Sequence, residues 1–329
     1  MPLPSSRSSG HRARGPLAAI RRQLVKTKFA EPVDLDGKTM VVTGAARGSL
    51  GFETARILAG WGATVAVTTR ADTGAVVAVL QDTLEHDAAT RVQGHPLDLC
   101  DRASVTAFVD WVNTRYPGGV DVLVNNAGVH LDLLSRWKEP HLSGDGHEPQ
   151  WRINYLGTMH LTDALLPALH ERAKATGDAR IVNVGSHLHE RGANADLFGA
   201  TRPYESWNAY GHSKLALIHA TTELQRRYAD SGLQAYCLHP GAVCTNVAAR
   251  GLEEVPALQS LRNALLSVES FFLKTPAEGA QTQVHCASSP GLPGGLYYQE
   301  CEPLEPSSDC RDSEVAGRLW DETQRWIQG

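Results

Sequence analysis

A tyrosine and a lysine lie four positions apart in the stretch YGHSK, as Tyr210 and Lys214. Four positions along a helix bring two side chains onto one face, within reach of each other. A free phenol titrates near pH 10 and is a poor acid or base at neutral pH, but a neighbouring ammonium group stabilises the phenolate and lowers its pKa. The pair could therefore move a proton to or from a substrate oxygen. Because this spacing also arises by chance, other residues must support the interpretation.

Two further stretches end apolar runs with polar side chains. Ser186 closes RIVNVGS, where its hydroxyl could donate a hydrogen bond to a substrate carbonyl or could simply cap the end of a strand. In LVNNAG, residues 123–128, the asparagines can satisfy neighbouring backbone groups, and the Ala-Gly pair lets the chain pass close to a flat ring. The histidines of HLHE, His187 and His189, have no partner cluster at metal-ligand spacing, so we predict no metal site.

The stretch TGAARGSLG, residues 43–51, lies between a buried apolar run and a helical pattern. A strand, a glycine turn and a helix N-terminus in this order can bind a pyrophosphate. The glycines stand at 44, 48 and 51, one residue too far apart for a usual turn. Either Gly48 keeps the role of the middle glycine while Ser49 or Leu50 bulges, or Ser49 takes that role after a longer loop. We favour the second alternative, because it frees Arg47 to turn outward.

The second apolar run, residues 64–69, ends at Thr69 and Arg70, about twenty residues past the last glycine of the turn. A carboxylate at this place binds the 2′-hydroxyl of NAD(H), whereas an arginine accommodates the 2′-phosphate of NADP(H). Arg70 and Arg47 therefore predict NADP(H), with NAD(H) as the less favoured cofactor. The alternative is that Arg70 is a surface residue and Asp72 contacts the ribose.

The whole chain has an ordinary globular composition of 329 residues, 42% hydrophobic and 20% charged, with a net charge of −5 that argues against nucleic-acid binding. Residues 1–30 hold seven of the 31 Lys and Arg and no acid. We expect residues 1–31 to be a partly disordered basic head, in which Leu17, Ile20 and Leu24 form an amphipathic helix that either touches an anionic membrane or packs on its own domain. Six cysteines without a CxxC pair and no membrane-length apolar run predict a cytoplasmic protein, with peripheral membrane contact as an extension.

Residues 32–329 alternate short apolar runs with longer helical patterns, without an internal linker. This order predicts a single α/β domain, a Rossmann-type doubly wound, mostly parallel sheet of seven strands with helices on both faces. The expected strands are 39–43, 64–69, 91–98, 121–126, 180–186, 233–240 and 295–299, and the expected helices are 52–60, 74–86, 102–115, 150–176, 209–231, 277–288 and 313–327. The segments 187–208 and 246–274 follow strand ends and are candidate substrate walls. The second is apolar, which favours a lipophilic substrate, although it could instead pack on the sheet or form a dimer surface.

The motifs, taken in order, resemble the short-chain dehydrogenase/reductase family. They are the TGxxxG turn, LDL (97–99), NNAG, INYLG (153–157), RIVNVGS, YGHSK and HPGAVCTN (239–246), and they cover the chain from about residue 32 to 327. The stretches EPVDLDGKTMVVTGA, TRPYESWNAYGHSK, TPAEGAQT and GGLYYQECEP are similar to the retinol-dehydrogenase-like branch of that family. One departure is Gly185, which stands where the family often has a second serine.

The resemblance assigns roles to individual residues. Tyr210 would be the general acid–base, Lys214 would lower its pKa and hold the nicotinamide ribose, Ser186 would polarise the carbonyl, and Asn154 would support a water that relays protons to Lys214. The cofactor would contact the first turn and the second strand end, the adenine would meet Asp98 and Leu99, and two later loops would line the adenosine and close over the nicotinamide. The implied cofactor residues are Gly44, Arg47, Ser49, Leu50, Gly51, Arg70, Asp98, Leu99, Asn126, Ala127, Gly128, Tyr210, Lys214, Pro240, Gly241, Val243 and Thr245.

The expected activity is an NADP(H)-dependent interconversion of an alcohol with a ketone or aldehyde, on a small lipophilic molecule such as a retinoid, a steroid or a fatty carbonyl. One alternative is reduction of a carbon–carbon double bond, as in the similar protochlorophyllide reductase branch. Another is a non-catalytic NADP(H)-binding regulator, against which the complete Ser–Tyr–Lys–Asn set argues. The resemblance is compatible with a homodimer or a homotetramer.

Overall fold

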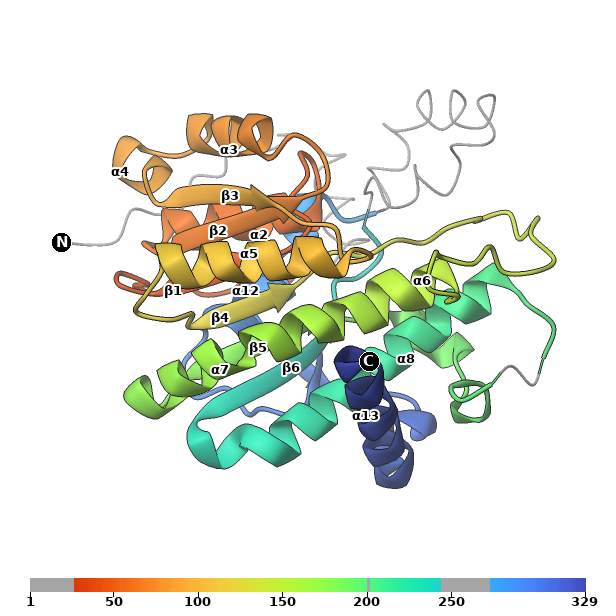
Figure 1. The fold of residues 1–329 in the computed structure, drawn as a ribbon. Helices are drawn as coiled ribbons and strands as arrows, with labels where there is room; N and C mark the ends of the chain where they lie inside the picture. Colours follow the sequence, from red (N-terminus) through yellow and green to blue (C-terminus); the bar gives the residue numbers. More distant parts are fainter. Residues whose placement is uncertain (1–26, 200–201, 244–272) are drawn as a thin grey trace, which may run out of the picture.

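The structure is a computed structural model that describes residues 27–199, 202–243 and 273–329. Eight strands form one sheet in the order β3-β2-β1-β4-β5-β6-β7-β8, with helices on both faces (Figure 1). The strands are β1 (Thr39–Val42), β2 (Thr64–Thr69), β3 (Val92–Pro96), β4 (Val122–Asn125), β5 (Ala179–Val184), β6 (Leu233–His239), β7 (Tyr297–Gln299) and β8 (Glu302–Leu304). Seven of them are parallel, and the predicted doubly wound fold is confirmed.

The predicted count of seven strands was one short. The additional strand, β8, pairs antiparallel with β7 after a tight turn in which Glu300 and Cys301 have φ of 51° and 59°. Its three residues, Glu-Pro-Leu, are all exposed at the edge of the sheet. A short, exposed strand containing proline is tolerated at an edge and carries no apolar pattern, so no sequence pattern marks it.

The helices follow the strands along the chain. They are α2 (Leu50–Gly60), α3 (Thr73–Asp82), α4 (His86–Ala89), α5 (Arg102–Arg115), α6 (Pro149–Trp151), α7 (Thr158–Thr176), α8 (Ser206–Tyr228), α11 (Pro276–Gly279), α12 (Gln281–Ser288) and α13 (Ser313–Gln328). The predicted helices 74–86 and 277–288 are each divided in two. The predicted helix 150–176 is divided between α6 and α7 by a π-helical turn, Arg152–Gly157.

Alternate residues of each buried strand enter two separate cores. In β1, Val41 packs in the core that α5, α7 and α8 cover, whereas Met40 and Val42 pack in the core beneath α2 and α12. Figure 1 shows these helices on opposite sides of the sheet. Because both faces are covered, all six residues of β5 are buried, which explains the continuous apolar runs in the sequence.

Three sequence expectations fall partly or wholly beyond the described residues. The basic head, apart from residues 27–31, and the apolar segment 246–272 lie outside them, as does Thr245. Among the helices that the structure describes, none is long and apolar enough to cross a membrane.

Candidate cofactor and catalytic site

A cavity lies at the carboxyl ends of the strands, where the strand order reverses between β1 and its neighbours β2 and β4. Such a reversal is the usual ligand-binding place of a doubly wound sheet. The lining residues are Gly44, Ala46, Ser49, Leu50, Thr68, Thr69, Arg70, Leu97, Asp98, Leu99, Asn126, Ala127, Gly128, Val129 and Ile153. Nine of the predicted cofactor residues are therefore in one lining, drawn from four separate stretches of the chain.

The first turn divides its roles between Gly48 and Ser49. Ser49 is the N-cap of α2, where its hydroxyl accepts a hydrogen bond from the amide of Phe52 (3.1 Å) and donates one to the carbonyl of Gly44 (3.1 Å). Gly48 has a φ of +74° and open space around its Cα, so it provides the left-handed turn conformation. Ser49 and Leu50 face the cavity, which is the geometry of the longer-loop alternative, while the pyrophosphate contact itself stays a prediction.

Gly51 is constrained by its neighbours rather than by its conformation. A Cβ at this position would lie 2.8 Å from the carbonyl oxygen of Gly44 and 2.5 Å from Nδ2 of Asn126. That amide nitrogen donates to the carbonyl of Thr43 (2.8 Å), while Oδ1 of Asn126 accepts from Gln283 (3.2 Å). The side chain of Asn126 thus connects the first turn to β4 and, through Gln283, to α12. No sequence pattern indicated this supporting role of Gln283.

At the end of β2, an arginine and an aspartate have different surroundings. Arg70 is exposed and lines the cavity. Asp72, the alternative ribose contact, accepts a hydrogen bond from the amide of Ala75 (3.1 Å) and so caps α3. Arg47 is exposed on the first turn and is not among the described residues that line the cavity.

The four predicted catalytic residues gather beyond the Gly128 end of the cavity. Tyr210 and Lys214 lie on α8, and the ammonium nitrogen of Lys214 is 5.5 Å from the centre of the Tyr210 ring. A Cβ on Gly128 would lie 3.4 Å from that nitrogen and 3.3 Å from Oδ1 of Asn154. Ser186 follows β5 and shares a side-chain hydrogen bond with Tyr210. The cluster is therefore continuous with the cavity lining.

Buried hydrogen bonds fix two members of this cluster. Nζ of Lys214 donates to the carbonyl of Val184 (2.9 Å). Oδ1 of Asn154 accepts from the amide of Val129 (2.8 Å), and its Nδ2 donates to the hydroxyl of Ser213 (3.1 Å). Asn154 lies in the π-helical turn, a type of helix distortion often found at functional sites.

The pKa of Tyr210 moves opposite to the prediction. Burial raises it to about 12, against the opposing effect of the hydrogen bond with Ser186. Burial also lowers the pKa of Lys214 to about 8. Loss of hydration therefore dominates the pKa of Tyr210 in this structure, in which the ammonium group of Lys214 donates to the carbonyl of Val184. At neutral pH the phenol of Tyr210 is thus protonated and Lys214 is mostly cationic.

A histidine outside all the predicted site residues packs on Tyr210. His130 stacks on the ring of Tyr210, with 4.3 Å between ring centres and an interplanar angle of 15°, and meets Trp207 edge-on at 4.6 Å. Burial lowers its pKa to about 4, so the ring is neutral. Its Nε2 is buried without a hydrogen-bond partner. Its place two residues after Gly128 was the only sequence signal for it.

The predicted residues after β6 lie beside the lining: a Cβ on Gly279 would be 2.6 Å from Val243 and 2.7 Å from the lining residue Leu50. Pro240, Gly241 and Val243 follow β6 and are not among the described lining residues of the cavity. His189, in the segment 187–208, hydrogen-bonds the carbonyl of Ser186 (2.8 Å) and the amide of Ser307 (3.2 Å). Within the described ranges, no group of three His, Cys, Asp or Glu side chains could hold a metal ion.

Known proteins with similar sequences and structures identify the family of this chain. A family model described as short chain dehydrogenase matches residues 38–255. Retinol dehydrogenase 11 from Homo sapiens is 36% identical over 306 residues, which are 92% of this chain and 89% of that protein. Retinol dehydrogenase 12 from Mus musculus is 36% identical over 295 residues, 88% of this chain and 85% of the relative.

A solved structure extends the similarity to the fold. The crystal structure of an uncharacterized protein from Mycobacterium paratuberculosis superposes with a TM-score of 0.68 at 32% identity, over 92% of this chain and 98% of the other. The family match spans the first turn, the catalytic cluster and most of the sheet. The chain belongs to the short-chain dehydrogenase/reductase family, in its retinol-dehydrogenase-like branch.

Proposed function

We propose that this oxidoreductase uses NADP(H) to interconvert an alcohol and a carbonyl group on a small lipophilic molecule, with Ser186, Tyr210, Lys214 and Asn154 as its catalytic residues. The observation that carries the proposal is the position of Lys214 beside Gly128, at the end of the cavity that starts at the first turn, with the ring centre of Tyr210 5.5 Å from the Lys214 nitrogen. The relatives are named for retinol, and we extend that chemical class to this chain as a retinoid, steroid or fatty carbonyl substrate.

The cavity suits a dinucleotide at both ends. It begins at the N-terminus of α2, an 11-residue helix whose first backbone amides attract phosphate oxygens. It ends at Gly128, where even a Cβ would crowd Asn154 and Lys214, so a flat ring can approach the cluster closely. At the β2 end, Arg70 supports NADP(H), because the carboxylate of Asp72 is engaged in the cap of α3.

The chemistry divides between the cofactor and the protein. A bound nicotinamide would supply or accept the hydride. In the direction of reduction, Ser186 donates a hydrogen bond to the substrate carbonyl, and the phenol of Tyr210 gives its proton to the oxygen as negative charge develops there. In the direction of oxidation, Tyr210 takes the proton back. The cation on Lys214 favours the phenolate, and Asn154 holds the backbone of Val129 beside the reacting groups.

The test is consumption of NADPH with a panel of retinal, steroid ketones and long-chain aldehydes, for the wild type and Tyr210→Phe. We expect Tyr210→Phe to lower kcat by about 10²–10⁴-fold while NADPH binds unchanged, because only the proton donor is lost. Tyr236→Phe is the matched control, since it removes another buried tyrosine hydroxyl, one bonded to the carbonyl of Leu292 (3.0 Å).

Unchanged turnover in Tyr210→Phe would show that the catalytic assignment is wrong. Reduction of an enone at its double bond, with the carbonyl left intact, would favour carbon–carbon reduction instead. Binding of NADPH without turnover of any panel member would favour a regulator.

A further inference from the structure

Arg152 is a buried arginine that holds part of the cavity wall. Its side chain is 1% exposed and lies in the π-helical turn Arg152–Gly157. Two guanidinium nitrogens donate to the carbonyls of Leu99 (2.7 Å) and Cys100 (2.7 Å), and Nε pairs with Asp145 (2.6 Å). Leu99 lines the cavity next to Asp98, at the end where an adenine would lie. The rigid fork of Arg152 therefore fixes two consecutive peptide groups of this wall.

The same arginine packs against the last turn of the C-terminal helix. Cζ of Arg152 lies 4.8 Å from the ring centre of Trp326 in α13, and Cζ of Arg102 lies 4.3 Å from it. Arg102 also donates to the backbone carbonyls of Trp326 and Ile327. These carbonyls form the negative end of the α13 dipole, which favours a cation. Trp326 is thus fastened between two arginines.

The π-helical turn connects this contact to the rest of the site. Ile153 lines the cavity and Asn154 belongs to the catalytic cluster. A Cβ on Gly157 would lie 2.3 Å from the carbonyl oxygen of Leu99, so turn and wall are in close contact. The hydroxyl of Tyr155 bonds that of Thr323 in α13 (2.7 Å), and both side chains are buried. Helix α13 therefore supports the turn through two separate contacts.

We propose that Arg152 and Trp326 are a positioning pair, through which α13 holds the Leu99–Cys100 wall against the adenine end of a bound dinucleotide. This inference rests on the proposed cofactor site. Without Trp326, Arg152 loses the aromatic face that confines its guanidinium group, and the Leu99–Cys100 wall becomes more mobile. Ordering this wall when the cofactor binds then costs conformational entropy. The affinity for the adenine half should fall, while the catalytic cluster stays assembled.

The experiment compares two tryptophans of α13 in the full-length protein. Trp320 is the matched control, because it is buried (7% exposed) and stacks with Arg227 (4.9 Å from Cζ to the ring centre), a residue outside the cavity lining. The Kd values of NADPH and of adenosine 2′,5′-bisphosphate, an adenine-half probe, are measured by calorimetry. Thermal unfolding and the separate effects on KM and kcat accompany them.

For Trp326→Ala we expect both Kd values to rise about five- to tenfold, with KM for NADPH rising in proportion and kcat within about twofold. Trp326→Phe keeps an aromatic face and should restore most of the affinity. Trp320→Ala should lower the unfolding temperature as much and leave both Kd values unchanged. Arg152→Lys, which keeps the charge but not the fork, should weaken binding like Trp326→Ala and serves as the second variant if that protein does not fold.

Unchanged Kd values in Trp326→Ala and Arg152→Lys, or equal losses in Trp320→Ala, would overturn the positioning role and leave the cofactor site in place. A wild-type protein that binds neither NADP(H) nor NAD(H) would instead overturn the proposed function. The two failures are therefore distinguishable.

Discussion

The side chain of Lys214 changes its charge within the neutral to mildly alkaline pH range. Burial lowers its pKa to about 8 from the usual 10.5, so the side chain is cationic below that pH and neutral above it. In the proposed mechanism, a cation at Lys214 would favour the phenolate that Tyr210 becomes when it gives its proton to the substrate. A neutral Lys214 removes this effect, so raising the pH through about 8 should weaken reduction.

We expect kcat/KM for carbonyl reduction to fall between pH 7 and 9.5, with its midpoint near the pKa of about 8 that burial gives Lys214. In Lys214→Arg, any remaining activity should lack this decline, because a guanidinium group stays charged over the whole range. Initial rates at saturating NADPH, in buffers of constant ionic strength, provide the measurement. A wild-type profile that stays flat to pH 9.5 would contradict the assignment.

Arg70 is the residue on which we propose that the choice of cofactor depends. It lines the cavity at the end of β2, whereas Arg47 is exposed on the first turn outside the described lining. Arg70→Asp should raise the Kd of NADPH by about 10- to 100-fold, because a charge-assisted contact with the 2′-phosphate is replaced by repulsion, and NADH should bind as well as before or better. Arg47→Asp should change the ratio of the Kd of NADPH to the Kd of NADH less than Arg70→Asp does.

Titration of both cofactors into both variants measures this preference. Equal weakening of NADPH and NADH by Arg70→Asp would indicate a structural role for this arginine and no specificity for NADP(H).

At the scale of elements, the sequence predicted the parts that burial controls. The central strands β1, β2, β4, β5 and β6 follow from buried apolar runs, and the main helices from the longer patterns between them, each to within a few residues. The missed strand β8 is exposed, so no apolar run marks it. The π-helical turn was missed for a different reason. It is an insertion inside a helical pattern, and only packing against the carbonyl of Leu99 reveals why Gly157 belongs there.

The positions of site residues could be predicted where motifs lie at strand ends. They could be predicted less well where contacts between distant parts of the chain determine the position or the pKa of a side chain. Gly44, Asn126 and Gly128 meet in one lining because parallel strands bring their carboxyl ends together. The stacking of His130 on Tyr210 joins two elements far apart in the chain, which no local pattern encodes. The high pKa of Tyr210 likewise depends on burial that becomes visible only in the folded molecule.

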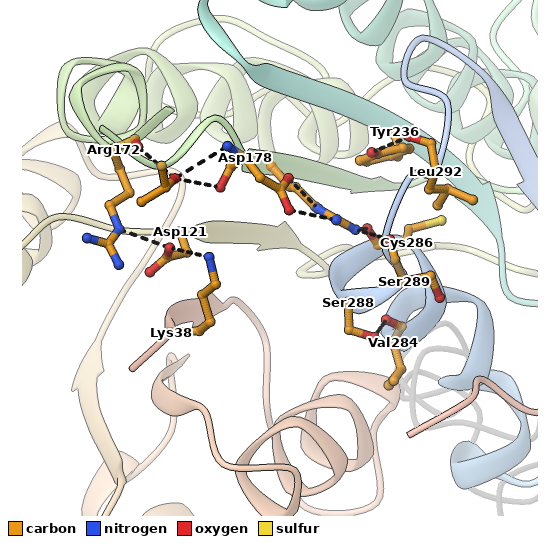
Figure 2. A network of polar contacts seen from close by, with 12 residues as sticks. Lys38, Asp121, Arg172, Asp178, Tyr236, Val284, Cys286, Ser288, Ser289 and Leu292 are labelled. Carbon is orange, nitrogen blue, oxygen red and sulfur yellow. Dashed lines mark hydrogen bonds and ion pairs between the residues drawn. The ribbon is translucent and has the colours of Figure 1, made fainter. Parts of the chain in front are cut away.

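At the scale of the whole molecule, charged contacts at the amino ends of the strands, opposite the cavity, hold together the strands that carry the site. Asp121 is 1% exposed just before β4 and accepts hydrogen bonds from Lys38 (3.1 Å), Arg172 (2.9 Å) and the amide of Thr39 (2.9 Å). Figure 2 shows Asp121 between Lys38 and Arg172, with a further chain of contacts from Asp178 to the end of α12. These contacts join β1, β4 and α7 at the amino ends of the strands.

We predict that substitutions at the amino ends of the strands change the stability of the fold, whereas substitutions at the carboxyl ends change catalysis. Asp121→Asn should lower the free energy of unfolding by about 2 kcal/mol, since two cations lose their buried partner but are partly exposed and regain hydration. Asp110→Asn, an exposed position on α5, makes the same change in net charge and is the control. Urea unfolding measures the stability of both variants, and steady-state assays with NADPH measure their kcat and KM.

Because the cavity lies at the carboxyl ends, the kinetic constants of Asp121→Asn should stay within about twofold of the wild type below its unfolding range. A selective loss of kcat with unchanged stability would mean that the two edges are coupled through the strands themselves.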